Sequence, residues 1–394
     1  MELWNSHRYK DIQRLNVVLF WYMNDWGKYG RAYEKIAENL SNQDEIHRVM
    51  CVLPPAKTRR RYFVLPFVFN NISNKLIVLT PNLRVVPSRL GSGQFQKRIN
   101  EIYPLIVLSI SSKLFSFRRD NTVLWVFPPH PYIENLKNWI PRRALITQIV
   151  DNNIHKEHEP AENIESVKKQ YEALAKNSDI VITSSNLNFE YFSKLNPNCY
   201  LFENAVDPSF LGDPSDFPYR AKKTRPRLGY TGWISQRTDI NLLGHLAKIR
   251  PEYDFIIAGP IEIPQTEFLK LMLPNVRYEG IIPYDNMPDF LKSLDICLIP
   301  HHDTAFSRSM SPLKMFQYLA SGRPIVSTKV AGVDRWNRLI SIAENHDDFV
   351  SKIDETLKND TVENSRERVE AARLETWDKR VKDMVGTILG VINN

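Results

Sequence analysis

The chain has 394 residues, 43% of them hydrophobic and 25% charged, with a formal net charge of +7. These proportions are typical of a globular protein, and the length suits two domains better than a single core. No apolar run reaches the roughly 18 to 20 residues of a membrane-spanning helix, and the three cysteines lie far apart. The composition argues against an integral membrane protein, a disulfide framework and a structural zinc site.

The cysteines and the first residues also bear on the cellular compartment. Scattered cysteines without disulfide spacing favour a reducing environment. Residues 1–14 are polar and of mixed charge, unlike a secretory signal. We therefore expect a cytoplasmic protein.

Local basic clusters occur at Lys57–Arg61, Phe117–Arg119 and Arg220–Arg227. Such clusters can bind nucleic acid, anionic lipid headgroups or phosphorylated small molecules, although charge runs are more often solvated loops. The chain has no RNA-recognition signature, no paired Cys/His finger and no continuous basic helix. We expect no nucleic-acid partner and keep an anionic membrane surface, at the inner face of the plasma membrane, as a candidate partner.

In the first half of the chain, β-branched runs alternate with helical patterns. Strands are predicted at 15–20, 48–53, 62–69, 75–79, 123–127, 144–150, 180–183 and 199–202, and helices at 31–40, 94–115 and 164–175. The runs 62–69 and 75–79 flank Asn70-Asn71 and are expected to pair as a hairpin.

A second series follows a polar linker over 207–226. Strands are predicted at 227–230, 254–258, 276–279 and 296–299, and helices at 240–249, 267–272, 287–294 and 311–322. An apolar run at 324–326 follows the last of these helices.

This alternation predicts an α/β protein with parallel sheets and crossover helices. We expect two doubly wound, Rossmann-like domains facing a cleft, with residues 1–206 in the first and 207–371 in the second. A hydrophobic stripe predicts a helix over about 372–394 that crosses back to the first domain. Ligands of such sheets bind beyond the carboxyl ends of the strands, so the cleft is the expected active site.

The segment 311–322 has the signals of a helix at both ends. Ser311 suits the N-cap, Pro312 the first helical position, and Gly322 the left-handed residue after the last turn. Lys314 lies in the first turn, where the helix dipole disfavours a cation. An anion bound between Lys314 and the free backbone N–H groups would explain this position. The alternative is a surface helix with an ordinary solvated lysine.

Spacing divides this helix into two faces. The predicted polar face consists of Lys314, Gln317, Tyr318 and Ser321. The predicted apolar face, which can pack on a sheet, consists of Leu313, Phe316 and Ala320. Gln317 can then hydrogen-bond a ribose hydroxyl or a phosphate beside Lys314, or it can be an ordinary surface residue.

The second half resembles the donor domain of GT-B glycosyltransferases in an ordered set of motifs. They are Gly229–Gly232, Arg237–Asp239, Phe255–Gly259, Val276–Gly280, Pro283-Tyr284, Asp295–Pro300 and Ser311–Gly322. Asn204–Asp207 is similar to the turn that ends the first domain of these enzymes, and Gly27 and Gly30 resemble their N-terminal glycine loop. The pattern is similar to that of bacterial polysaccharide-assembly transferases of the family 4 type, including teichuronic acid enzymes.

The chain departs from the family 4 pattern around the helix at 311–322. Family 4 enzymes usually carry two glutamates eight positions apart, where this chain has Ser309 and Gln317. Lys314 and Gln317, with Tyr318, instead resemble the arrangement in xanthan-type glucuronosyltransferases, which invert. The retaining or inverting outcome is therefore left open.

The resemblance implies a glycosyltransferase that moves a sugar from a nucleotide diphosphate, expected to be UDP, to a saccharide or lipid-linked saccharide of a bacterial surface polysaccharide. Lys314 and the helix N-terminus would neutralise the departing diphosphate, with Arg237 as a second cation or, alternatively, a surface partner of Asp239. No Asp-x-Asp motif preceded by an apolar strand is present, so neither a metal nor another cofactor is expected. The expected donor site consists of Thr231, Gly232, Arg237, Ile281, Ser311, Leu313, Lys314 and Gln317.

Asp151 is the candidate general base. It directly follows the apolar run 145–150, so its carboxylate is expected at the carboxyl end of a buried strand. A carboxylate there can take the acceptor proton if burial raises its pKa, and the resemblance to inverting relatives favours this role. Asp151 could otherwise cap the following turn, and the nearby His155, His158 or Glu159 could act as the base.

The acceptor site is expected at the glycine loop, with Trp26, Gly27 and Gly30. Aromatic faces pack well against sugar rings, and this loop holds Trp21, Tyr22, Trp26 and Tyr29. Core packing explains Trp21 and Tyr22 equally well, so Trp26, beside Gly27, is the expected contact. His301–Asp303, at a later strand end, is interpreted as a sugar-hydroxyl contact. Two alternative functions are a nucleotide-sugar epimerase of the same fold and a non-catalytic nucleotide-binding scaffold.

Overall fold

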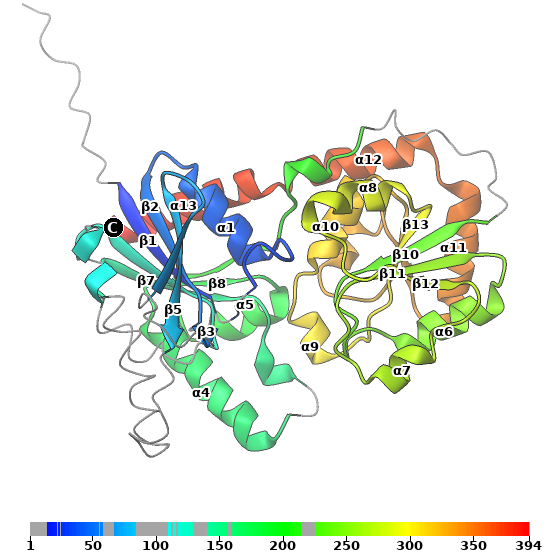
Figure 1. The fold of residues 1–394 in the computed structure, drawn as a ribbon, viewed down its shortest axis with the longest axis horizontal. Helices are drawn as coiled ribbons and strands as arrows, with labels where there is room; N and C mark the ends of the chain where they lie inside the picture. The colour runs from blue at the N-terminus through cyan, green and yellow to red at the C-terminus, as the bar shows by residue number, and fades with distance from the viewer. Residues whose placement is uncertain are drawn as a thin grey trace, which may run out of the picture.

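The computed structural model describes residues 14–21, 23, 25–54, 56–57, 67–83, 109–111, 113–115, 117–129, 140–156, 159–213 and 225–393. Within these residues the chain forms two α/β lobes, each built on its own sheet (Figure 1). None of the described helices combines the length and the apolar character needed to cross a lipid bilayer.

The first sheet has nine strands in the order β3-β5-β2-β1-β6-β7-β8-β9, with β4 paired to β5. Every pair described in it is parallel except β4 with β5, which forms the predicted hairpin. The strands are β1 (Leu15–Phe20), β2 (Ile46–Val52), β3 (Ala56–Lys57), β4 (Phe67–Asn71), β5 (Leu76–Leu83), β6 (Thr122–Val126), β7 (Ala144–Ile149), β8 (Ile180–Thr183) and β9 (Cys199–Leu201).

Helices cover both faces of this sheet, which is why β1, β6 and β7 are buried along their whole length. One face packs against α1 (Ala32–Ser41) and α13 (Trp377–Ile392). The other face packs against α4 (Ala161–Asn177) through Leu174. A short helix, α5 (Asn186–Phe192), follows β8 and is capped by Ser185, whose hydroxyl accepts the N–H of Asn188.

The second sheet has six strands in the order β12-β11-β10-β13-β14-β15, and its described pairs are all parallel. The strands are β10 (Arg227–Thr231), β11 (Asp254–Ala258), β12 (Val276–Tyr278), β13 (Ile296–Ile299), β14 (Ile325–Thr328) and β15 (Ser341–Ala343). Since β10 lies between β11 and β13, the connections leave in opposite directions from it. A crevice is expected at such a point, beyond the carboxyl end of β10.

The helices of the second lobe also lie on both faces of their sheet. One face carries α6 (Ile240–Ile249), α7 (Gln265–Leu269) and α11 (His346–Asn359), and the other carries α8 (Met287–Lys292), α10 (Leu313–Ala320) and α12 (Val362–Arg373). A single turn, α9 (Ala305–Arg308), precedes α10. The predicted α/β architecture of two doubly wound domains is confirmed.

The last helix, α13, runs from the second lobe back onto the first (Figure 1). Trp377, Val381 and Met384 lie in the core of the first sheet. Backbone hydrogen bonds from Val206 N–H to the Glu375 carbonyl (2.9 Å) and from Trp377 N–H to the Val206 carbonyl (3.0 Å) fix the crossing point. We propose that residues 1–206 with 372–394, and residues 207–371, are the two folding units.

Some predicted elements differ from the structure or cannot be compared with it. The helix α5 was not predicted. The predicted strand 62–69 is described only from residue 67, where β4 begins, and most of the predicted helix 94–115 lies outside the described residues. Most of the expected linker, 214–224, and His158 also lie outside them.

Candidate active site

A cavity lies between the two lobes, where strand ends from both sheets meet. Its walls include residues just after β7 and β10 and the first turn of α10. Nine residues predicted from the sequence line it, namely Asp151, Thr231, Gly232, Arg237, Ile281, Ser311, Leu313, Lys314 and Gln317.

Lys314 has no acidic partner in this cavity. Its ammonium nitrogen lies 3.9 Å from the centre of the Tyr230 ring and 3.1 Å from Nε2 of His301. No described carboxylate forms an ion pair with it, and burial together with the nearby Arg237 guanidinium holds the pKa of Lys314 well below its usual value. A bound anion would stabilise its charged form.

Gly232 leaves the space that the Lys314 side chain fills. A Cβ built on Gly232 would lie 2.9 Å from the Lys314 ammonium nitrogen, and the glycine has a φ of +122°. A larger residue at position 232 would therefore push Lys314 out of its place and strain the turn after β10.

His301 is buried, and hydrogen bonds of its main chain to Thr328 fix its position. Its N–H donates to the Thr328 hydroxyl oxygen (3.0 Å), and the same hydroxyl donates to the His301 carbonyl (2.7 Å). Burial and the cations Lys314 and Arg237 lower the pKa of His301 well below its usual value. When the Lys314 ammonium donates to Nε2 of a neutral His301, the proton of the imidazole lies on Nδ1.

Arg237 is a second cation without a carboxylate partner among the described residues. Its Nη1 lies 2.8 Å from the Met310 sulfur, and its Nε lies 3.4 Å from the Ser235 hydroxyl. The predicted alternative, a pair with Asp239, is not formed. Asp239 instead caps α6 through the Leu242 N–H (2.8 Å) and contacts His346 (2.9 Å).

The start of α10 differs from the prediction by one residue. The helix begins at Leu313 with Pro312 at the cap, whereas Ser311 had been expected there. The Ser311 hydroxyl is occupied because it accepts the Asn204 N–H (3.0 Å), and the Ser311 carbonyl accepts the Asn204 side-chain amide (2.6 Å). The predicted left-handed Gly322 is confirmed, with a φ of +70°.

The predicted faces of α10 need a second correction. Tyr318 is fully buried and binds Thr231, accepting its N–H at 2.8 Å. Ser321 donates to the carbonyl of Tyr318 within its own turn (2.8 Å). Of the expected polar face, only Lys314 and Gln317 line the cavity. Leu313 packs against the first lobe and not on the second sheet, because the cleft brings the other core to this end of the helix.

Buried asparagines of the first lobe hold the segment before α10. The Asn188 amide donates to the Ser309 carbonyl (2.8 Å), and the Asn152 N–H donates to the Ser309 hydroxyl (3.4 Å). Asn152 and Asn188 also bind each other (3.0 Å). We call Asn152, Asn188, Asn204, Ser309 and Ser311 the interdomain seam. Ser309, the site of a family 4 glutamate, therefore faces the first lobe.

Asp151 lies two residues after β7 and lines the cavity. Asn152, not Asp151, caps the following turn, because its side chain accepts the Ile154 N–H (3.1 Å). The Asp151 side chain makes no hydrogen bond or ion pair within the described part of the chain. The alternative bases are less well placed, since His155 does not line the cavity and Glu159 pairs with Lys156 at 2.9 Å.

The expected acceptor residues lie outside the cavity wall. Trp26 packs edge-on against Tyr33, with 5.7 Å between ring centres. Gly27 is exposed, and Gly30 has a φ of +57° with the Tyr284 ring only 2.1 Å from where its Cβ would be. Trp21, Tyr29 and Arg31 of the same region line the cavity instead. Arg31 follows Gly30 at a helix start, so its sequence position was a signal that could have been used.

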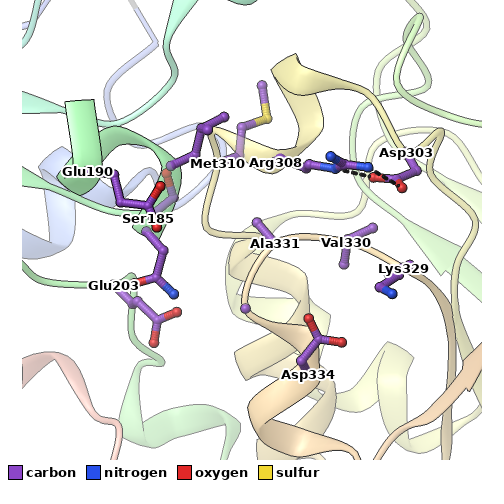
Figure 2. Close-up of a pocket in the computed structure, with 13 residues that line it drawn as sticks. Ser185, Glu190, Glu203, Asp303, Arg308, Met310, Lys329, Val330, Ala331 and Asp334 are labelled. Atoms are coloured by element: carbon purple, nitrogen blue, oxygen red, sulfur yellow. Dashed lines mark hydrogen bonds and ion pairs between the residues drawn. The ribbon is translucent and has the colours of Figure 1, made fainter.

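A second hollow shares only Met310 with this cavity (Figure 2). In Figure 2, Ser185, Glu190 and Glu203 of the first lobe face Asp303, Arg308 and Lys329 of the second. Its four carboxylates, which include Asp334, outnumber its two cations, and Arg308 is already bound by Asp303 at 2.7 Å through both oxygens. This hollow does not suit a polyanion. Elsewhere too, the described residues contain no group of three His, Cys, Asp or Glu side chains that could hold a metal ion.

Comparisons with known proteins agree with this geometry. A family described as glycosyl transferase-like matches residues 237–386. The chain is 22% identical, over 90% of its length and 92% of the other, to the teichuronic acid biosynthesis glycosyltransferase TuaH of Bacillus subtilis (strain 168).

Solved structures share the fold. Sucrose-phosphate synthase from Thermosynechococcus elongatus superposes with a TM-score of 0.73 at 14% identity, covering 96% of this chain and all of the other. The Escherichia coli trehalose-6-phosphate enzyme bound to UDP-2-fluoro glucose gives 0.68 at 10% identity, with 96% and 99% covered. TarM gives 0.57 at 16% identity, with 75% and 58% covered. The chain is a glycosyltransferase with a GT-B fold.

Proposed function

We propose that the protein transfers a sugar from a UDP-linked donor to a saccharide or lipid-linked saccharide during synthesis of a bacterial surface polysaccharide. The name of the relative TuaH, a teichuronic acid biosynthesis glycosyltransferase, supports the product class. A UDP sugar fits the cavity between the lobes because that cavity offers cations for the diphosphate and partly exposed polar groups for the nucleoside.

One observation carries the proposal: two cations, Lys314 and Arg237, face an interdomain cavity without a carboxylate partner among the described residues. The first turn of α10 adds free backbone N–H groups at the same place. The diphosphate gains negative charge as the glycosidic bond breaks. Preorganised cations at that position stabilise the transition state more than the ground state, so no metal is needed for this role.

The nucleoside would lie beside Gln317 and Ile281. The Gln317 side-chain amide lines the cavity and makes no hydrogen bond within the described residues, so both of its ends can bind a ribose hydroxyl. Ile281 is 52% exposed and follows Gly280, whose φ is +70°. Thr231 and Gly232 would complete the donor site at the end of β10.

Asp151 is the proposed general base for the acceptor hydroxyl. Its carboxylate lines the same cavity and is not occupied in capping. The variant Asp151→Asn should abolish transfer and keep UDP affinity, because only the proton acceptor is lost. A normal transfer rate in this variant would assign the base to another group.

The acceptor would approach from the first lobe, where Trp21 and Tyr29 line the cavity. The loop containing Trp26, Gly27 and Gly30 would shape that approach and not contact the sugar directly. Gly30 allows the loop to lie against Tyr284 of the second lobe.

We also propose peripheral binding to the anionic inner face of the plasma membrane, where lipid-linked acceptors occur, with the enzyme in the cytoplasm. Leu114 is 67% and Ile110 is 49% exposed, and the exposed Arg118 and Arg119 follow them in the chain. Apolar side chains beside cations suit an interface with anionic lipid. Flotation with vesicles containing anionic lipid should show binding that weakens with salt; binding that ignores lipid charge would contradict this proposal.

A thermal-shift panel of nucleotides and nucleotide sugars tests the donor class. A ligand that binds only the folded chain raises the melting temperature according to its concentration relative to Kd. We expect UDP and one UDP sugar to raise it more than GDP or uridine. A flat response to every uridine nucleotide, at concentrations up to the millimolar range, would overturn the proposed donor.

A further inference from the structure

Arg31, at the start of α1, brings a third cation into the interdomain cavity. It lines the cavity from the first lobe, whereas Lys314 and Arg237 line it from the second. Burial raises the pKa of Glu262, and the positive charges of Arg237 and Arg31 both oppose that rise. The two guanidinium groups therefore influence the same carboxyl group.

A buried carboxylate orients the Arg31 side chain. The Arg31 Nε lies 2.9 Å from Oδ2 of Asp25, which is only 5% exposed. The other oxygen of Asp25 accepts from the Trp21 indole (2.9 Å) and the Tyr33 hydroxyl (3.1 Å). Three side chains therefore donate hydrogen bonds to the Asp25 carboxylate. The carboxylate in turn orients the guanidinium group of Arg31.

The two terminal nitrogens of Arg31 remain available for a ligand. The only hydrogen bond of the Arg31 side chain within the described part of the chain is the one from Nε to Asp25. The free edge is a pair of parallel N–H donors, the geometry that binds two oxygens of a phosphate together. A guanidinium held by one edge in this way loses little further freedom when an anion binds.

Contacts across the cleft keep Arg31 at the cavity. Its guanidinium carbon lies 4.9 Å from the centre of the Trp233 ring, which belongs to the second lobe. The Tyr29 ring meets the Trp233 ring edge-on at 5.7 Å. Gly30, between Tyr29 and Arg31, lies so close to Tyr284 that no larger side chain fits. The glycine loop is thus seated between two aromatic residues of the second lobe.

We propose that Arg31 binds the donor diphosphate from across the cleft, completing with Lys314 and Arg237 a site to which both lobes contribute. The inference rests on the proposed function and extends it, because it makes phosphate binding depend on the approach of the first lobe. The described residues that line the cavity include these three cations and a single carboxylate, Asp151.

Calorimetric titration with UDP and with uridine tests this role. In Arg31→Gln we expect UDP to bind about 10- to 100-fold more weakly, since a charge-assisted hydrogen bond is lost, while uridine binds within about twofold of wild type. The UDP affinity of Arg31→Lys should lie between those of wild type and Arg31→Gln, because lysine keeps the charge and lacks the paired donors. Lys28→Gln is the matched control, an exposed lysine in the same loop, and should bind UDP within about twofold of wild type because its charge is screened.

The outcomes separate this inference from the donor assignment. If wild type binds no UDP, the proposed function itself fails. If wild type binds UDP and Arg31→Gln binds it equally well, only the role of Arg31 is overturned. An equal loss of UDP and uridine affinity in Arg31→Gln would also overturn it, because the residue would then act only by holding the lobes together.

Discussion

The groups in direct contact with the Lys314 ammonium are uncharged, and the Arg237 guanidinium nearby is a cation. The Tyr230 ring attracts the cation, an interaction worth about 0.5–2 kcal/mol, and His301 offers one lone pair. Neither replaces the water that burial removes, so the pKa of Lys314 is lowered. A diphosphate would supply the missing negative charge. We therefore infer that the residue serves ligand binding more than the stability of the unliganded chain.

Glu34 gives a test of pH dependence at the residue scale. One of its oxygens is buried without a hydrogen-bond partner, and burial raises the pKa of the carboxyl from 4.5 to about 7 although the nearby Gly27 N–H lowers it. Between those two values the folded chain holds a proton that the unfolded chain has lost. This contribution to stability is present below pH 4.5 and is lost as pH rises through about 7.

We expect Glu34→Gln to remove this dependence, because glutamine has nearly the same shape and stays neutral at every pH. Urea unfolding at pH 8 should show the variant more stable than wild type by up to about 3 kcal/mol, with the gap closing near pH 4.5. Asp44→Asn, an exposed change close by, should leave the wild-type slope unaltered. A variant with the same pH slope as wild type would mean that Glu34 is ionised in the fold.

Residue positions were predictable from the sequence where local geometry decides them. Lys314 and Gln317 share a helix face because they are three positions apart, and both reach the cavity. Tyr318 satisfies the same spacing, yet its hydroxyl binds Thr231, 87 positions away in the chain. No local pattern shows that contact. The stacking of Arg31 on Trp233 was missed for the same reason.

At the scale of elements, α10 is positioned by the first lobe as much as by its own sheet. The interdomain seam fixes the carbonyls of Ser309 and Ser311, just ahead of the helix. Asn188, Ser309 and Asn204 are 5% exposed or less. Polar groups this deeply buried must be hydrogen-bonded to avoid a large penalty. The seam thereby sets the direction in which the first turn of α10 faces the cavity.

Removing one donor of the seam should be costly. In Asn188→Ala the Ser309 carbonyl would be left buried without its partner, and we expect a loss of about 1–3 kcal/mol in the free energy of unfolding. UDP affinity should fall as well, because α10 loses its support. Asn186→Ala changes an exposed asparagine of the same helix and should alter stability by no more than about 0.5 kcal/mol. Equal melting temperatures for the two variants would show that the seam carries no stability.

The bounds of several elements with strong sequence patterns were predicted correctly, whereas a helix with a weak pattern was missed. The bounds of β1, β8, α6, β11 and β13 agree with those expected from the sequence. The helix α5 was missed because its seven residues, Asn-Leu-Asn-Phe-Glu-Tyr-Phe, include asparagines and aromatic residues of modest helix propensity. It forms because Phe192 and Asn188 are both fully buried in this fold.

At the scale of the whole molecule, the sequence predicted two α/β lobes but not how they meet. The alternation of strands and helices indicates doubly wound sheets whatever the strand order. The order itself, with β1 between β2 and β6 and β10 between β11 and β13, depends on long-range pairing. The contacts across the cleft depend in turn on that order. This is why the cavity residues of the second lobe were predictable, whereas the position of Arg31 on the cavity wall was found only in the structure.

The crossing of α13 links the two lobes a second time. The helix leaves the second lobe beside Val206 and packs against α1, whose N-cap is Arg31. This arrangement ties the position of Arg31 to the relative placement of the lobes.

The measurement that tests the central claim most directly is calorimetric titration of UDP into wild type and Lys314→Ala, with uridine as the reference ligand. We expect the variant to fold normally, to bind uridine as wild type does, and to bind UDP about 10- to 100-fold more weakly, because one charge-assisted contact to phosphate is lost. Equal UDP affinity in the two proteins would contradict it, because the diphosphate would then lie elsewhere than at the start of α10.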